Sequence, residues 1–274
     1  MDISLNQKEQ ILKEVRASMA GATLSYLAAL YKCDVQNLTG RLLGSGAYLS
    51  IGGQTYILTA EHNFREGEKT PGLIVHSIGY GARPEPVGKI VVREAPADIA
   101  VCEVGPISKQ GESDFAPNDG NALARRRYEA LPIEMLAENS DDLDGDVLFV
   151  HGFVGERSKF FEMAKGIISQ TFSYATFLGR SSYAWFDPRI HLAVEYPTEG
   201  QEDEFGKKVS KMPDPNGLSG SVLWRANRKY YGLTDWHPGL ARVVGIVTHW
   251  DQPAQSLIAT RIEAVHAALS KIRQ

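Results

Sequence analysis

The first part of the chain carries apolar residues at steps of three and four, which is the period of an amphipathic helix. These positions lie within residues 11–26, and Asn6 with Glu9 three residues later forms the N-terminal pair of a capping box. The pattern predicts a helical extension over residues 1–36 that packs on the side of the main domain. The alternative is a helix that binds a regulatory partner.

From about residue 40 the pattern changes to short apolar runs broken by glycine, which is typical of strands. Gly52-Gly53 is a two-residue hairpin signal between the first two runs. In the first half the predicted strands are 41–51, 54–60, 72–78, 89–93 and 99–104. In the second half they are 146–151, 166–171, 182–186, 191–196, 221–224, 229–233 and 243–250. Because no helices separate these strands, the pattern argues against a parallel α/β sheet and favours a β-barrel or a sandwich.

The stretch between the two sets of strands is polar and irregular. Residues 106–145 are rich in Asp, Asn and Gly, and a short helix is predicted around 128–138. At the end of the chain, apolar residues on one side of 256–272 predict a helix. We therefore expect one main domain over 37–274, with a break between its two halves near 106–145.

Composition narrows the classes of function. Of 274 residues 43% are apolar, and the net charge of -4 gives no electrostatic case for nucleic acid or an anionic membrane as partner. No stretch approaches the ~18 consecutive apolar residues of a membrane span. The polar N-terminus lacks the basic and apolar regions of a secretory signal. Cys33 and Cys102 are expected to be free thiols in a reducing compartment, so we expect a cytoplasmic protein.

The sequence predicts neither a metal site nor a cofactor. The seven histidines are scattered, without H-x-x-x-H or Cys/His spacing. No glycine loop of the phosphate-cradling kind follows a predicted strand. Any chemistry is therefore expected to come from side chains unaided.

Three residues are suited to hydrolysis by a nucleophilic serine. His62 follows an apolar strand, Asp98 opens an apolar run, and Ser219 lies in a glycine-flanked turn before a strand. A serine hydroxyl is a poor nucleophile at neutral pH unless a neutral imidazole takes its proton as it attacks a carbonyl. A buried carboxylate fixes the tautomer of that imidazole and stabilises the imidazolium. Each residue alone is common in turns and strand ends, whereas their order and context together indicate a catalytic triad.

The segments around these residues resemble three motifs of the chymotrypsin-like serine peptidases. YILTAEHN contains His62 and looks like T-A-x-H; DIAV begins at Asp98 and looks like D-I-A-L; GLSGS contains Ser219 and looks like G-x-S-G. The order His, Asp, Ser is also that of the family. The resemblance covers roughly residues 40–270. It implies a mainly β fold of two six-stranded antiparallel barrels, with an added N-terminal helix and a C-terminal helix.

The resemblance also implies an activity. The protein would be a bacterial, non-secreted serine endopeptidase that hydrolyses proteins or peptides through an acyl-enzyme. Ser219 would be the nucleophile, His62 the general base and acid, and Asp98 the residue that orients His62. The backbone N–H groups of Gly217 and Ser219 would form the oxyanion hole.

Three positions depart from the secreted members of the family. Leu218 stands where zymogen-activated members typically carry an aspartate, so activation by N-terminal cleavage is not expected. Asn63 stands where secreted members often carry a disulfide cysteine. Glu61 stands where a small residue is more usual, and we expect its side chain to face solvent.

Substrate specificity is assigned by the same resemblance. GIVTHW over residues 245–250 resembles the strand that binds extended substrate, so Thr248, His249 and Trp250 are expected to flank the substrate. The bulky Trp250 predicts a shallow pocket and a small side chain before the scissile bond. Asp214 is expected near the base of that pocket, and a pocket lined by it would instead prefer Lys or Arg.

Two alternatives stay open. The first is an α/β-hydrolase esterase, since DVLFVHGFVG over 146–155 resembles the strand and oxyanion segment of that fold. The proline-containing MPDPN before the serine turn argues against it, because a nucleophile elbow needs a strand there. The second is a protease-like fold that serves as a catalytically silent or partner-activated binding module.

Overall fold

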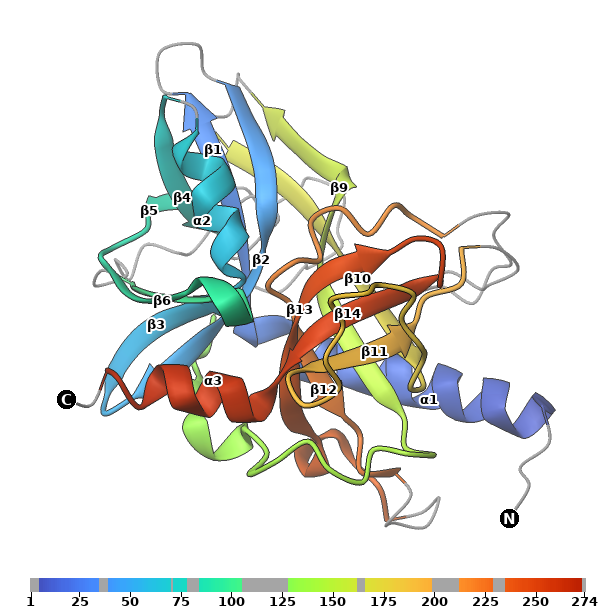
Figure 1. Ribbon diagram of the computed structural model, residues 1–274. Coiled ribbons are helices and arrows are strands. Elements are labelled where there is room, and N and C mark those ends of the chain that lie inside the picture. The colour runs from blue at the N-terminus through green and yellow to red at the C-terminus, as the bar shows by residue number, and fades with distance from the viewer. Residues whose placement is uncertain are drawn as a thin grey trace.

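Two β-sheets form most of the computed structural model, with a long helix near the N-terminus and a shorter one near the C-terminus (Figure 1). The structure describes residues 5–34, 39–69, 71–77, 84–104, 128–161, 166–198, 212–228 and 235–272. The predicted fold class is therefore confirmed in its main features: the protein is mainly β, arranged in two halves, with a helix near each end.

The first sheet has the strand order β5-β4-β1-β2-β3-β7-β6, and β8 pairs with β2. Its strands are β1 Leu27–Asp34, β2 Thr39–Ile51, β3 Gln54–Thr59, β4 Leu73–Ser77, β5 Glu85–Pro86, β6 Ile90–Glu94, β7 Ile99–Glu103 and β8 Leu131–Pro132. The sheet thus has eight strands where six were expected. The predicted Gly52-Gly53 hairpin is confirmed, because both glycines have positive φ and join β2 to β3.

The second sheet has six strands in the order β10-β9-β12-β13-β14-β11. They are β9 Leu148–Phe161, β10 Gly166–Thr176, β11 His191–Glu195, β12 Val222–Arg225, β13 Arg242–Asp251 and β14 Ser256–Arg261. The pairs within it are antiparallel. One apolar core joins the two halves, since Leu49 and Leu58 of the first sheet share it with Phe149 and Trp224 of the second.

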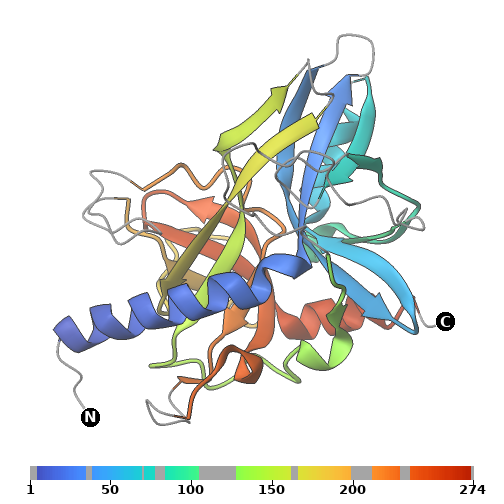
Figure 2. The ribbon, with the colours of Figure 1, turned by 180° about the vertical axis from the view of Figure 1, so that it is seen from behind.

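The N-terminal helix is shorter than the predicted extension over 1–36. Helix α1 spans Leu5–Thr23, and residues 27–34 form β1 inside the first sheet. That run is apolar on both faces of the strand, and such a run fits a buried helix as well as a strand. Figure 2 shows α1 lying across the back of the molecule, where it contacts β9 and β10. Val15 and Met19 are fully buried in the shared core.

Two further helix predictions were wrong. The segment predicted as helix over 256–272 begins as β14, which pairs with both β13 and β11, and only then forms helix α3, Ile262–Leu269. The buried part of β14 has three consecutive apolar residues, 257–259, between a serine and a threonine, and so short a run cannot separate strand from helix by its period. Around 128–138 the chain forms β8 and one 3₁₀ turn in place of the predicted helix. The predicted strand over 229–233 lies outside the described residues.

Candidate active site

His62 and Asp98 lie on neighbouring segments of the first sheet. His62 is the second residue of helix α2, Glu61–Glu68, which begins directly after β3. Asp98 stands between a 3₁₀ turn and β7, with a left-handed backbone at φ 52°. Its Oδ2 accepts a hydrogen bond from His62 Nδ1 at 2.6 Å, and its Oδ1 accepts one from the His62 backbone N–H at 2.9 Å. The carboxylate therefore fixes both the helix start and the imidazole.

The electrostatics of this pair suit an orienting carboxylate. Burial alone would raise the pKa of Asp98, but the hydrogen bonds from His62, with the charges of His62 and His249, outweigh it and lower the pKa. Asp98 is 8% exposed, so its charge is screened by little water. Because a carboxylate only accepts, the proton of a neutral His62 lies on Nδ1, and Nε2 is left as the base.

Ser219 lies in a turn before β12, and the first sheet holds this turn in place. The Ser219 carbonyl accepts hydrogen bonds from the Ser45 N–H at 2.8 Å and from Asn63 Nδ2 at 3.0 Å. Ser45 Oγ also donates to the Gly217 carbonyl at 2.7 Å. Leu218 is fully buried among apolar residues of the second half, in agreement with the absence of an aspartate there. The serine turn is thus built across the junction of the two sheets.

The Ser219 hydroxyl does not reach the imidazole in this state. It donates to the Thr248 carbonyl at 3.2 Å, and the described residues contain no hydrogen bond between Ser219 and His62. Catalytic hydrogen bonds are often long or misaligned in proteins without substrate. For Ser219 to bond to His62, the bond from its hydroxyl to the Thr248 carbonyl must first break.

The backbone N–H groups of Gly217 and Ser219 are both available to an oxyanion. Neither donates to any other described residue. Each N–H group shares a planar trans peptide with the carbonyl of the preceding residue, and that carbonyl accepts a hydrogen bond on the opposite side of the peptide. The Asn216 carbonyl accepts from Gly155 N–H at 2.8 Å, and the Leu218 carbonyl accepts from Ser221 N–H at 2.9 Å.

Gly217 is a position that requires glycine. Its φ of 105° is strained for any other residue. A Cβ there would lie 2.5 Å from Leu42 Cδ2 and 2.8 Å from the Phe153 carbonyl oxygen.

Of the four predicted substrate-binding residues, three line one strand beside His62. Thr248, His249 and Trp250 occupy the end of β13. The His249 ring lies 5.7 Å from the His62 ring, and its Nδ1 lies 4.0 Å from Asp98 Oδ2. Asp214 Oδ1 accepts a hydrogen bond from the Asn216 N–H at 2.9 Å within its own turn, and among the described residues no hydrogen bond or ion pair joins Asp214 to the other three.

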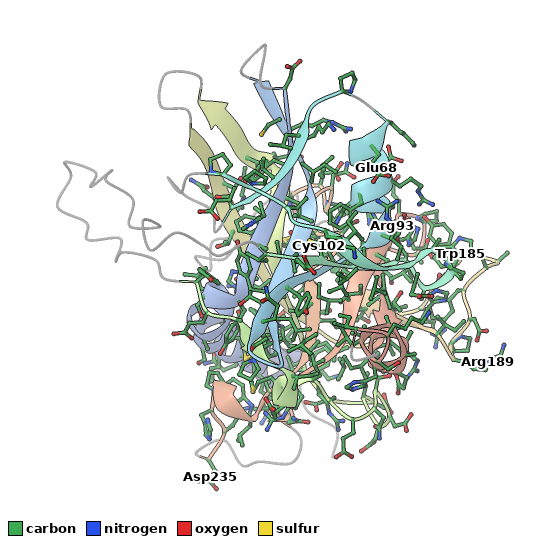
Figure 3. The ribbon with its side chains drawn as sticks, turned by 90° about the vertical axis from the view of Figure 1, so that its left-hand side faces the viewer. Glu68, Arg93, Cys102, Trp185, Arg189 and Asp235 are labelled. Atoms are coloured by element: carbon green, nitrogen blue, oxygen red, sulfur yellow. The ribbon has the colours of Figure 1, made fainter. Side chains whose placement is uncertain are left out.

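The sequence predicted a strand over 182–186, whereas the structure has an irregular segment over 181–185, here called the strap. Its serines bond to the Asp251 carboxylate, and its Tyr183 hydroxyl donates to the Trp250 carbonyl. These bonds replace a strand ladder. Trp185 lies at the surface of the molecule, 46% exposed, with its ring 5.0 Å from that of His249 (Figure 3). The aromatic and serine content of this segment was the available signal.

Ser45 and Asn63 were also missed as supports of the serine turn, and the prediction for Glu61 was wrong. Glu61 is 5% exposed and lies 3.7 Å from Arg65 and 3.9 Å from Arg93. It begins α2, where the helix and the two guanidinium groups favour a buried negative charge. Figure 3 shows Arg93 beside the same helix, where it also pairs with Glu68.

The structure bears on one of the two open alternatives, the α/β-hydrolase. The segment 146–155, which suggested an α/β-hydrolase, runs into β9, and β9 pairs antiparallel with β10 and β12. That arrangement differs from the mostly parallel sheet of an α/β-hydrolase.

Among the described residues no group of His, Cys, Asp and Glu could hold a metal ion. None of the helices in the same ranges is long and apolar enough to cross a bilayer.

Comparison with known proteins gives a likeness of structure at low identity. No family model matches the chain, and no curated protein matches it significantly. The Rv3671c protease of M. tuberculosis in its active form is 15% identical with a TM-score of 0.48, covering 94% of this chain and 86% of that one. A variant of the HtrA-type protease AlgW with a tripeptide is 15% identical with a TM-score of 0.48, covering 94% and 63%.

A third structure comes from a study of how aromatic interactions drive the coupled folding and binding of the intrinsically disordered VPg protein of Sesbania mosaic virus. It is 15% identical to this chain with a TM-score of 0.46, and the match covers 89% of this chain and 90% of that one. Two of these three similar structures are proteases. The roles of individual residues in this chain follow from its own site.

Proposed function

We propose that the protein is a serine endopeptidase in which Ser219 is the nucleophile, His62 the general base and acid, and Asp98 the orienting carboxylate. The observation that carries the proposal is the Asp98–His62 pair, which is joined by two hydrogen bonds. It lies beside the serine turn, which Ser45 of β2 and Asn63 of α2 hold in place. A paired carboxylate and imidazole next to a serine is the arrangement that activates a hydroxyl.

In the proposed reaction, Ser219 Oγ attacks the scissile carbonyl while its proton passes to His62 Nε2. The oxygen of the tetrahedral intermediate takes the negative charge and accepts from the N–H groups of Gly217 and Ser219. His62 then gives its proton to the leaving amine, and the C–N bond breaks to leave an acyl-enzyme. A water molecule then attacks the acyl-enzyme while His62 takes its proton. The bond to Ser219 Oγ breaks, Ser219 regains a proton from His62, and the carboxylic acid product is released. Loss of one oxyanion donor costs ~3 kcal/mol in related enzymes.

The test is labelling with a fluorophosphonate, which reacts with activated serines whatever the substrate. We expect the wild type to be labelled at Ser219, and Ser219→Ala and His62→Ala to stay unlabelled. Ser221→Ala is the matched control, since Ser221 is a buried serine two residues further on. A folded wild type that resists labelling would overturn the proposal.

A second candidate function is a partner-activated protease, and one observation favours it: the Ser219 hydroxyl is bonded to the Thr248 carbonyl and not to His62. A regulatory partner would have to use the polar side of α1, because Val15 and Met19 on its apolar side are already buried. Labelling that appears only on addition of a partner separates this candidate from the first.

We also propose a cytoplasmic location, because the two cysteines are free thiols.

A further inference from the structure

The end of β13 presents a strand edge beside the serine turn. Ladder pairing with β12 ends at Ile246, and the serine turn bonds to Val247. From His249 to Asp251 the described pairing is with β14 alone. Carbonyls two residues apart on an extended strand point to the same side, so those of Thr248 and Trp250 share one edge. Such an edge binds an extended peptide by main-chain hydrogen bonds.

Both carbonyls on this edge already accept a hydrogen bond from a hydroxyl group of the protein. The Thr248 carbonyl accepts from Ser219 Oγ at 3.2 Å, and the Trp250 carbonyl accepts from the Tyr183 hydroxyl at 2.7 Å. The first bond must break for Ser219 to turn towards His62, so catalysis itself frees Thr248. Nothing in the proposed reaction frees Trp250.

Tyr183 is held firmly where it lies. Asp251 is fully buried, and its carboxylate accepts from Ser181 Oγ at 2.8 Å and from Ser182 N and Oγ, each at 2.6 Å. Burial alone would raise the pKa of Asp251, but these bonds outweigh it and lower the pKa to about 2, so the anchor is ionised at neutral pH. The Tyr183 ring also stacks on Trp185, with centroids 5.0 Å apart.

We propose that Tyr183 is a specificity-determining residue whose hydroxyl denies the Trp250 carbonyl to the substrate backbone. A peptide paired antiparallel with this edge donates the N–H of its first residue before the scissile bond to Thr248, and the N–H of its third residue to Trp250. Because the Tyr183 hydroxyl occupies the Trp250 carbonyl, the enzyme recognises the backbone of only the first two substrate residues before the scissile bond. The favoured substrates are peptides that bind without a backbone contact from their third residue. This inference rests on the proposed endopeptidase function.

The experiment compares kcat/KM for N-acetylated p-nitroanilides of one, two and three residues, in the wild type and in Tyr183→Phe. In the wild type we expect the third residue to change kcat/KM by less than about 2-fold. In Tyr183→Phe, which keeps the ring, the third residue should raise kcat/KM by about 3- to 10-fold, the size of one neutral hydrogen bond.

A tripeptide with a methyl group on the nitrogen of its third residue is the matched control. It lacks the N–H that would reach Trp250, so the gain in Tyr183→Phe should disappear with it. An equal gain from the third residue in the wild type and in the variant would overturn the inference, and so would a gain that survives N-methylation.

Failure of the proposed function is detected separately. Fluorophosphonate labelling reports on Ser219 and is measured on both the wild type and Tyr183→Phe. If neither protein labels or hydrolyses, the length series is measured as equilibrium binding of the N-acetylated peptide amides to Ser219→Ala, with and without Tyr183→Phe. Tighter binding of the three-residue peptide only in the double variant supports the role of Tyr183, and equal binding overturns it.

Discussion

Asp98 adopts a left-handed backbone conformation, which Asp tolerates better than most residues, and this places both carboxylate oxygens towards His62. One oxygen bonds to the backbone at the start of α2 and the other to the imidazole. A single side chain therefore couples the position of the helix to the tautomer of the base.

Replacing Asp98 by Asn tests the role of the carboxylate. The amide keeps the size of the side chain, but its nitrogen cannot accept the Nδ1 proton, so the imidazole is driven to the wrong tautomer. We expect kcat to fall by about 10³- to 10⁴-fold, with little change in KM. Steady-state hydrolysis and the labelling rate both measure this. Glu94→Gln, which removes a surface carboxylate paired with Lys271, should change neither, and a fully active Asp98→Asn would contradict the role.

At the scale of elements, the serine turn and the strap over 181–185 are both held by bonds to distant segments. Ser45 of β2 and Asn63 of α2 hold the turn, and Asp251 at the end of β13 holds the strap. Neither is a regular element, so the neighbouring strands supply the hydrogen bonds that a helix or a ladder would provide. The conformations of the serine turn and the strap therefore depend on single buried side chains.

The Asp251 anchor makes a prediction about stability. In Asp251→Asn the amide nitrogen faces the donors of Ser181 and Ser182, so several charge-assisted bonds are lost in a buried site. We expect the free energy of unfolding to fall by about 2–4 kcal/mol, measured by urea denaturation at pH 7. Asp187→Asn is the matched control, since Asp187 pairs with the exposed Arg189 just beyond the strap. Equal stabilities of the two variants would refute the anchoring role.

At the scale of the whole molecule, the sequence predicted the parts whose signals are local. The strand pattern predicted the two halves, and the motifs around His62, Asp98 and Ser219 predicted residues that the fold gathers at one junction. The short segments β1 and β14 were included in predicted helices, because the apolar positions of a short buried strand can also be placed on one side of a helix. The bond from Tyr183 to Trp250 could not be predicted, because its acceptor is a main-chain carbonyl 67 residues away.

The stability of the whole fold should depend on one buried histidine. His76 in β4 is 3% exposed; its Nδ1 bonds to the Tyr48 hydroxyl, and its Nε2 has no partner among the described residues. Burial lowers its pKa from 6.5 to about 4. The native state therefore holds the neutral ring, and its contribution is complete above pH 6.5. As the pH falls from 6.5 to 4, the unfolded chain takes up a proton that the native state refuses.

The sign of this linkage makes stability fall with acid, by about 3 kcal/mol between pH 6.5 and 4 for this residue. We expect His76→Gln to be less stable at pH 7, because the hydrogen bond between the His76 ring and the Tyr48 hydroxyl is lost, but to lose correspondingly less free energy on acidification. Denaturant unfolding at half-unit steps of pH measures both slopes. Substitution of the exposed His237 by Gln should retain the wild-type slope. Parallel slopes for wild type and His76→Gln would show that His76 takes up its proton without unfolding, and that the first sheet opens locally to admit it.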